Sequence, residues 1–256
     1  MSAHTYYETI SRILAAIHET QAGKIGQAAE AMTTAIAAGK RVYLFGSGHS
    51  VMPVMDVFPR YGSFIGFFPL YDPRLMWHNV IGPGGARELL WLERQEGYVE
   101  VFLRSYALEP GDCMLVFSHG GMNAAPVEAA LAAKKKGLTV ISVSSLANLG
   151  AAKITHSSGK ALSDAADIAI DNCVPPEDAL VDVGVKEKVA AGSTMAAVFI
   201  AMSLVAETGA RLAGRGIHPP TFVSPNVPGV EKDHNQRVFE RFAEEYFRRG
   251  PGPAEG

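Results

Sequence analysis

The chain has 256 residues, of which 48% are hydrophobic and 19% charged, proportions typical of a compact globular protein with a sizeable core. Its formal net charge of −3 creates no general basic field of the kind that attracts nucleic acid. The one basic cluster, Lys134–Lys136, stands where a helix is expected to end and suits the negative end of the helix dipole. Composition therefore argues against a nucleic-acid-binding protein.

The cysteines and the apolar stretches bear on the cellular compartment. Cys113 and Cys173 form neither a Cys-x-x-Cys pair nor a disulfide framework. The first ten residues lack the basic-then-apolar pattern of a secretory signal. The longest apolar stretch, Val189–Ala206, contains a glycine and several hydroxyl residues, which favours a buried helix over a membrane span. We expect a reduced, cytoplasmic protein without a membrane segment.

Apolar residues at helical spacing predict one long helix or two consecutive helices over Ser2–Ala38. After them, short apolar runs typical of buried strands alternate with stretches of helical periodicity. The expected strands are Arg41–Phe45, Ser63–Pro69, Cys113–Phe117, Thr139–Val143 and Asp167–Ile170. The expected helices are Val51–Val57, Arg87–Ala107, a helix from about Pro126 to Gly137, Val185–Arg211 and Arg237–Arg249, with a loop over residues 71–85.

Short apolar strands separated by helices imply a parallel sheet with helices on both faces. We predict an α/β three-layer sandwich with a parallel sheet of about five strands, related to the flavodoxin and Rossmann folds, with N-terminal helices. Because no linker is long enough to separate two domains, residues 1–256 are expected to form one domain. Residues 1–38 would form the N-terminal helices, 39–214 the ligand-binding core, and 215–256 an extended segment and a last helix.

Two strands run directly into loops of small and hydroxyl residues, VYLFGSGHS at Val42–Ser50 and MLVFSHGGMN at Met114–Asn123. Ligands of open parallel sheets bind beyond the carboxyl ends of the strands, where helix N-termini and glycine-rich backbone favour anions. The two loops therefore predict a site for a phosphate, with sugar hydroxyls as the next most suitable guest. The candidate binding residues, including the hydroxyls that end a third strand, are Ser47, Gly48, His49, Ser50, Ser118, His119, Gly120, Gly121, Asn123, Ser144 and Ser145.

Several other ligand motifs are missing from the sequence. The pattern Gly-x-x-x-x-Gly-Lys-Ser/Thr does not occur, and Val51 stands where a dinucleotide-binding Gly-x-Gly-x-x-Gly loop would have its third glycine. The histidines show no His-Glu-x-x-His or other paired metal spacing. We expect neither a metal nor a cofactor.

The order of these motifs carries a family resemblance. Strand-GSGHS, strand-SHGGMN-x-x-P and TVISVSS together resemble the SIS (sugar isomerase) domain over Glu30–Gly214. The resemblance implies the fold described above and a phosphosugar held by the two loops. Most members have Ser-x-Ser-Gly-x-Ser/Thr in the second loop, whereas this chain has His119 and Gly120 at positions where hydroxyl residues are common.

Within the family, Leu92–Asp112 is similar to N-acetylmuramic acid 6-phosphate etherases and also resembles phosphoheptose isomerases. When the etherases are aligned without gaps at Asp112, Glu93 falls on their catalytic glutamate and Glu96 on the acidic residue of their Arg-Glu-Gly step. Both enzyme families place a further glutamate on the helix after the first loop, where the nearest carboxylate of this chain is Asp56.

The resemblance makes Glu93 the first candidate for a catalytic base. Glu96 is expected on the same helical face as a partner whose charge would push their two pKa values apart. Glu187 is a third candidate. It precedes Gly192–Ser193–Thr194 much as a catalytic glutamate precedes Ser-Thr in the isomerase domain of glucosamine-6-phosphate synthase.

The proline-rich segment Gly216–Gly229 matches neither enzyme family and is similar to a separate, poorly characterised branch of SIS proteins. Its prolines predict an extended segment that either caps a site, including that of a neighbouring subunit, or packs on its own surface for stability. We expect a homodimer in which His218 and His234 are the candidate contributions of the neighbouring subunit.

Three functions remain open at this point. The first is a lyase that abstracts the C2 proton of an amino-sugar 6-phosphate, such as N-acetylglucosamine 6-phosphate, and eliminates the substituent at C3. The second is an aldose–ketose isomerase, which begins with the same proton abstraction. The third is a sugar-phosphate sensor without catalysis, against which stand the acidic net charge and the lack of a helix-turn-helix pattern before the first strand.

Overall fold

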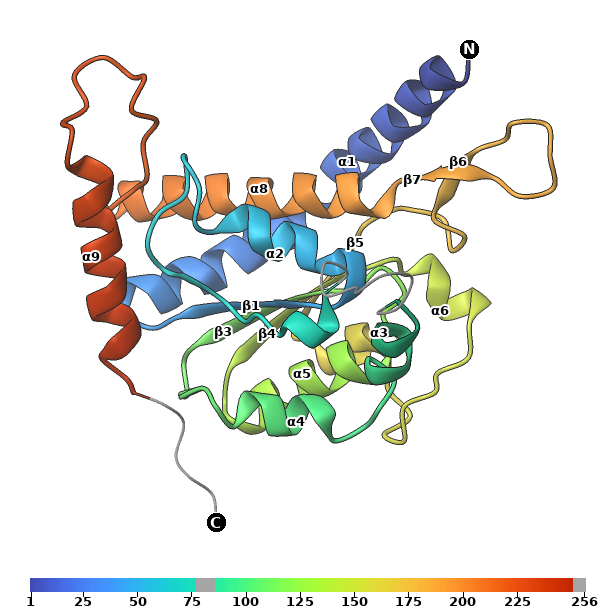
Figure 1. Cartoon of the computed structure of the whole chain (residues 1–256), viewed down its shortest axis with the longest axis horizontal. Helices are drawn as coiled ribbons and strands as arrows, with labels where there is room; N and C mark the ends of the chain where they lie inside the picture. The colour runs from blue at the N-terminus through green and yellow to red at the C-terminus, as the bar shows by residue number, and fades with distance from the viewer. Residues whose placement is uncertain (77–85, 251–256) are drawn as a thin grey trace.

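The computed structural model describes residues 1–76 and 86–250 (Figure 1). The strands are β1 (Val42–Gly46), β2 (Phe67–Pro69), β3 (Cys113–Phe117), β4 (Thr139–Ser144), β5 (Ile168–Asp171), β6 (Ala179–Val181) and β7 (Val189–Ala191). The helices are α1 (Ser2–Ala37), α2 (Val51–Val57), α3 (Ala86–Leu92), α4 (Tyr98–Leu103), α5 (Ala124–Lys135), α6 (Ala147–Ala151), α7 (Leu162–Ala165), α8 (Ser193–Gly214) and α9 (His234–Phe247), with short 3₁₀ helices at Gly48–Ser50 and Pro73–Leu75.

The main sheet has five strands in the order β2-β1-β3-β4-β5, and every neighbouring pair is parallel. In register, Val42 of β1 lies beside Cys113 of β3, and Gly46 beside Phe117, so the two strands end at the same edge. The α/β architecture with a parallel sheet and an N-terminal helix is therefore confirmed, and the two glycine-rich loops emerge side by side.

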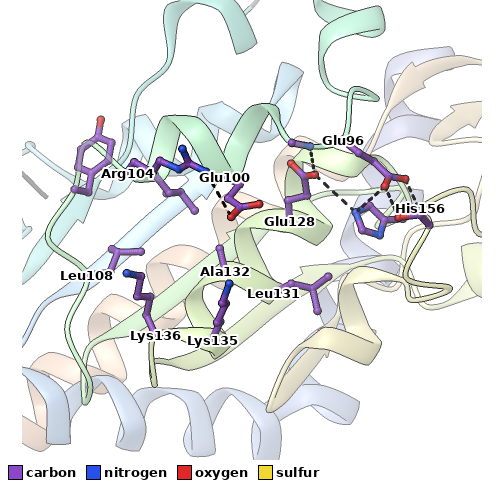
Figure 2. Close-up of a pocket in the computed structure, with 14 residues that line it drawn as sticks. Glu96, Glu100, Arg104, Leu108, Glu128, Leu131, Ala132, Lys135, Lys136 and His156 are labelled. Atoms are coloured by element: carbon purple, nitrogen blue, oxygen red, sulfur yellow. Dashed lines mark hydrogen bonds and ion pairs between the residues drawn. The ribbon is translucent and has the colours of Figure 1, made fainter. Parts of the chain in front are cut away.

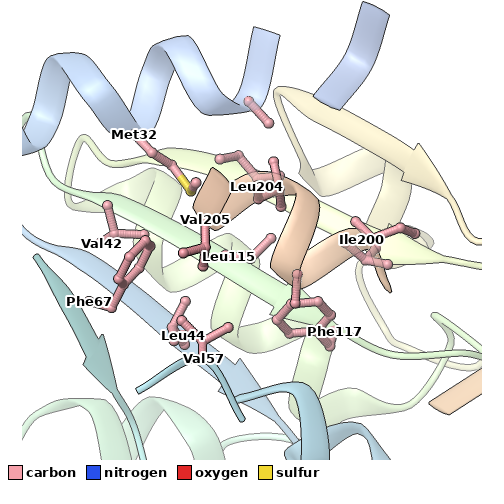
Figure 3. Close-up of a cluster of buried hydrophobic side chains, with 14 of the residues drawn as sticks. Met32, Val42, Leu44, Val57, Phe67, Leu115, Phe117, Ile200, Leu204 and Val205 are labelled. Carbon is pink, nitrogen blue, oxygen red and sulfur yellow. The ribbon is translucent and has the colours of Figure 1, made fainter. Parts of the chain in front are cut away.

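Helices cover both faces of the sheet (Figure 1). Alternate residues of β1 point to opposite faces: Val42 and Leu44 belong to one buried cluster, Tyr43 and Phe45 to the other. The first cluster lies under α1, α2 and α8, where Met32, Ile200 and Leu204 close over the strands (Figure 3). The cluster on the opposite face lies under α4, α5 and α7.

The long apolar helix begins later than the sequence predicts. Residues 189–191 form β7, which pairs with β6 in an antiparallel hairpin, and α8 starts at Ser193. Asp178 caps the N-terminus of α8. Its carboxylate accepts hydrogen bonds from the amides of Gly192 and Ser193 and from Ser193 Oγ. By length and composition α8 passes the test for a membrane span, as core helices of soluble proteins also do. Its fully buried Ile200 packs in the same cluster as α1.

The predicted helix over Arg87–Ala107 is wrong as a single element. Helix α3 ends at Leu92 and α4 begins at Tyr98, with a turn between them in which Gly97 has a φ of 87°. Glu128 of α5 fixes this turn by accepting hydrogen bonds from the amides of Gly97 and Val99. The break therefore depends on a residue that is distant in sequence.

The C-terminal segment packs against its own chain. Thr221 forms a β-bridge with Phe64, and backbone hydrogen bonds join Phe222 to Gly62 and Ser63. The predicted strand Ser63–Pro69 is correspondingly shorter, because only its last three residues join the main sheet. After α9, Arg249 donates two hydrogen bonds to the fully buried carboxylate of Asp112, at 2.7 and 3.0 Å.

Candidate active site

The loop after β1 is shaped by a close backbone approach. An added Cβ at Gly46 would lie 2.1 Å from the carbonyl oxygen of Ser50, so only glycine fits where the strand meets its 3₁₀ turn. The loop after β3 has a similar requirement at Gly121, whose φ of 67° is left-handed and whose added Cβ would lie 3.3 Å from Ser144. The glycines of both loops thus allow the turns that place the neighbouring side chains at the sheet edge.

Glu93 lies between these two loops, directly after α3. Its side chain is buried, and each of its carboxylate oxygens accepts a hydrogen bond of 2.8 Å, Oε2 from Ser47 Oγ and Oε1 from Asn123 Nδ2. Its backbone carbonyl accepts a bond from the amide of Ala125 at 2.9 Å. These contacts join the first loop, the end of α3 and the start of α5 around one carboxylate.

Burial raises the pKa of Glu93 above its ordinary value, although the hydrogen bond from Ser47 lowers it and opposes part of this effect. A carboxylate with a raised pKa is a stronger base than a solvated glutamate and takes up a proton closer to neutral pH. Position and electrostatics therefore both suit Glu93 for proton transfer.

A small pocket opens beside this arrangement at the carboxyl edge of the sheet. Its polar lining comes from His49, Ser50, Ser118, His119, Asn172, Ser193 and Thr194. The Nδ2 of Asn172 lies 3.2 Å from Nδ1 of His119. Because an amide nitrogen can only donate, Nδ1 accepts, and a neutral His119 then carries its proton on Nε2. Among the described residues that buried Nε2 has no hydrogen-bond partner, so it is available as a donor to a ligand.

Sequence reasoning missed Asn172, which follows β5. Its backbone amide donates a hydrogen bond to the carbonyl of Ser144 at the end of β4. The position of Asn172 therefore follows from the pairing of β4 with β5, and not from the glycine-rich loops themselves. The one available signal was its place just after an apolar strand, because β5 ends at the same edge as β4.

The remaining hydroxyl candidates differ in what they offer a ligand. Ser118 accepts a hydrogen bond from the amide of Gly121 at 3.1 Å and lines the pocket. Ser144 and Ser145 are 3% and 2% exposed, and Ser145 donates to the carbonyl of Val174 at 2.6 Å. This hydrogen bond uses the Ser145 hydroxyl to join the strand end to the segment after β5.

The expected pairing of Glu96 with Glu93 is wrong. Because α3 ends at Leu92, the two residues share no helical face, and Glu96 accepts hydrogen bonds from the amide and hydroxyl of Ser157 instead. The hydrogen bond from the Ser157 side chain is the main reason that the pKa of Glu96 is lowered, whereas that of Glu93 is raised. Glu96 lines a different pocket, described below.

Three other candidates lie apart from Glu93 within one chain. Glu187 is exposed in the turn that joins β6 to β7, in a hairpin that projects from the body (Figure 1). His218 and His234 belong to the segment around the start of α9, at the opposite end of the sheet from α3 (Figure 1). His234 Nε2 lies 2.8 Å from the carbonyl oxygen of Thr221 and donates to it.

No group of three or more histidine, cysteine, aspartate or glutamate side chains that could hold a metal ion occurs within residues 1–76 and 86–250. The groups described at the carboxyl edge include the buried carboxylate of Glu93, the Nε2 donor of His119 and several hydroxyl and backbone groups.

Comparison with known proteins places this chain in a family. The SIS domain family matches over residues 5–145. The chain is 35% identical over 241 residues to UPF0309 protein TTE0306 of Caldanaerobacter subterraneus subsp. tengcongensis, covering 93% of this chain and 96% of that protein. It is 36% identical over 237 residues to UPF0309 protein ABC0887 of Shouchella clausii, covering 92% and 94%.

Among solved structures, a phosphoheptose isomerase from Francisella tularensis has a similar fold, with a TM-score of 0.52 and 16% identity over 80% of this chain and 95% of that one. The loops after β1 and β3 that surround Glu93 both fall within the region that the family match covers. The chain therefore belongs to the SIS domain family and is similar along nearly its whole length to the UPF0309 proteins.

Proposed function

We propose that this protein is a sugar-phosphate lyase that abstracts the C2 proton of an amino-sugar 6-phosphate, such as N-acetylglucosamine 6-phosphate, and eliminates the substituent at C3. The observation that carries the proposal is Glu93, a buried carboxylate with a raised pKa between the two glycine-rich loops. Each carboxylate oxygen accepts one hydrogen bond from the chain and retains a lone pair for a substrate proton.

In the proposed first step, Glu93 takes the proton from C2 of the open-chain sugar, and the electron pair moves toward the C1 carbonyl oxygen. Ser47 and Asn123 hold the carboxylate in a fixed orientation, which limits the loss of conformational freedom at the moment of transfer. A negative charge develops on the oxygen at C1, and the pocket offers hydroxyl and backbone donors to stabilise it.

In the second step the substituent at C3 leaves with its bonding electrons, and its oxygen needs a proton. The carboxyl group of Glu93 now carries the proton taken from C2 and returns it to this oxygen, while Nε2–H of His119 donates a hydrogen bond that stabilises the departing oxygen. The sugar phosphate would be held by Ser50, Ser118 and the backbone of Gly120 and Gly121. Both steps move protons without a change of oxidation state that requires a redox cofactor.

The protein is proposed to act in the cytoplasm as a homodimer, without a nucleic-acid partner. His218 and His234 lie in the segment at the far end of the sheet from α3 (Figure 1). In the proposed dimer they would therefore contribute to the site of the other subunit and not to the site of their own.

Two alternatives are retained because specific observations favour them. An aldose–ketose isomerase needs only one base to move a proton between C2 and C1, and Glu93 is a carboxylate hydrogen-bonded to both loops. A sensor without catalysis is favoured by α2, which has no glutamate where the two enzyme families have one. The nearest carboxylate there, Asp56, forms an ion pair with Arg60.

The products distinguish these alternatives. The protein is incubated with N-acetylglucosamine 6-phosphate and the mixture is followed by proton NMR. The lyase predicts a vinylic proton signal and release of the C3 oxygen as water. A ketose spectrum without a vinylic signal would instead establish the isomerase, and an unchanged ligand that raises the melting temperature would favour the sensor.

A pH profile tests the electrostatics of Glu93. Replacing Ser47 with alanine removes a hydrogen bond that lowers the pKa of Glu93, so this pKa should rise further. Because the base acts only when deprotonated, the acid limb of kcat/KM should move to higher pH. Ser50→Ala is the matched control, since Ser50 lines the pocket without a described hydrogen bond to Glu93. Acid limbs that coincide in the two variants would contradict the proposed role of Ser47.

A further inference from the structure

A second cavity lies on the face of the sheet that α4 and α5 cover (Figure 2). It has a volume of about 490 Å³, within the range of small-molecule sites. None of its lining residues lines the pocket at the carboxyl edge. It is therefore a separate cavity, which the proposed lyase chemistry does not use.

One end of the cavity contains a histidine with one ring nitrogen that makes no hydrogen bond among the described residues. The side chain of His156 is 7% exposed, and its Nδ1 accepts a hydrogen bond from the amide of Ser158 at 3.1 Å. A neutral His156 therefore carries its proton on Nε2. Within the described residues this buried Nε2 has no hydrogen-bond partner. A buried donor without an acceptor is costly, and it indicates a group that the cavity is built to receive.

Two carboxylates face the same nitrogen. Oxygens of Glu96 and Glu128 each lie 4.0 Å from Nε2 of His156, too far for a direct hydrogen bond (Figure 2). Both carboxylates are fixed, Glu96 by the amide of Ser157 and Glu128 by the amide of Val99. A ligand hydroxyl between them would accept from Nε2 and donate to a carboxylate, which a single hydroxyl group can do at once.

The rest of the cavity has a different character. Lys135 lies two turns beyond Glu128 on α5, about 10 Å along the helix axis, and forms no ion pair among the described residues. Arg104 also lines this part, 3.9 Å from Glu100 (Figure 2). A cationic group therefore stands at roughly the length of a monosaccharide phosphate from the hydroxyl-binding end, over a floor that includes Leu131.

We infer that the cavity between α4 and α5 is a second small-molecule site, which takes a hydroxyl-bearing anion of the size of a sugar phosphate. The hydroxyl end binds at His156, Glu96 and Glu128, and the anion binds at Lys135. This inference goes beyond the proposed lyase activity and does not depend on it.

The test measures binding of glucitol 6-phosphate by isothermal titration calorimetry. This probe has the hydroxyls and the phosphate but no carbonyl group, so neither isomerisation nor C2-proton elimination can consume it. In Lys135→Glu we expect at least one binding site per chain to disappear or to weaken tenfold or more. Lys153→Glu is the control, because it makes the same charge change at an exposed lysine outside the cavity and should titrate like the wild type.

Two further variants keep the test unambiguous. His156→Phe preserves a ring of similar size without the Nε2 hydrogen and should weaken the same site tenfold or more. Ser118→Ala should affect only binding at the carboxyl edge. The inference is overturned if the wild type binds no probe at millimolar concentration, or if Lys135→Glu and Lys153→Glu titrate alike. It is also overturned if Ser118→Ala alone abolishes all binding.

Discussion

Replacing Glu93 with glutamine should lower kcat by about 10²- to 10⁴-fold, the usual contribution of a general base. Glutamine has nearly the same volume, and its amide oxygen can still accept a hydrogen bond from Ser47 or Asn123. The variant is therefore expected to keep the arrangement of the loops while losing the group that removes the proton. The measurement is the steady-state rate of substrate loss for the variant and the wild type.

The same variant should not lose stability. Burial raises the pKa of Glu93 in the folded protein above its value in the unfolded chain, so the folded state binds the proton more tightly. The stabilisation from this group is present at low pH and is lost as the pH rises through the folded pKa. At neutral pH the charged carboxylate thus opposes folding, and Glu93→Gln should melt at the same temperature as the wild type or higher.

Glu19→Gln is the matched control, because it makes the same chemical change at an exposed position on α1. It should retain wild-type kcat and melting temperature. A Glu93→Gln protein with wild-type turnover would remove Glu93 from the mechanism. A variant that is inactive and also unfolded would point instead to a structural role for the carboxylate.

Replacing Gly46 with alanine should destabilise the protein by about 3 kcal/mol, the upper part of the usual range for overpacking. The added Cβ would lie 2.1 Å from the backbone oxygen of Ser50, which cannot rotate away as the end of a side chain can. Relief of this contact requires the 3₁₀ turn Gly48–Ser50 to move. Since Ser47 lies between Gly46 and this turn, ligand binding should weaken together with stability.

Gly23→Ala provides the comparison within the same chain. Gly23 lies inside α1, and an added Cβ there meets no atom within 4 Å. Alanine should therefore stabilise the protein by up to about 1 kcal/mol through its higher helix propensity. Chemical denaturation of both variants measures the two free energies of unfolding, and equal effects would contradict the close approach at Gly46.

The sequence predicted those elements whose ends are marked locally. Strand β3 and helix α2 have the predicted bounds, because Gly111–Asp112 precedes the one and a proline follows the other. The break between α3 and α4 and the β6–β7 hairpin were missed. The turn at Gly97 depends on Glu128 from α5, and the start of α8 depends on Asp178, which directly precedes β6 on the other side of the hairpin.

The candidate site shows the same division. Ser47, Ser118 and Asn123 follow strands whose carboxyl ends meet at one edge, so their proximity could be inferred from strand order. The position of Glu93 came from a family resemblance, since nothing in its local sequence indicates a buried carboxylate. The orientation of His119 depends on Asn172, which only the pairing of β4 with β5 brings near.

We propose that this SIS domain protein removes a proton from C2 of a sugar phosphate. The most direct measurement is proton NMR of the wild-type protein in deuterated water with a panel of sugar 6-phosphates that includes N-acetylglucosamine 6-phosphate. We expect the C2 proton signal of at least one compound to disappear, and Glu93→Gln to slow this loss at least a hundredfold. Retention of every C2 signal, alongside thermal stabilisation by one of the compounds, would contradict it and establish a binding protein without catalysis.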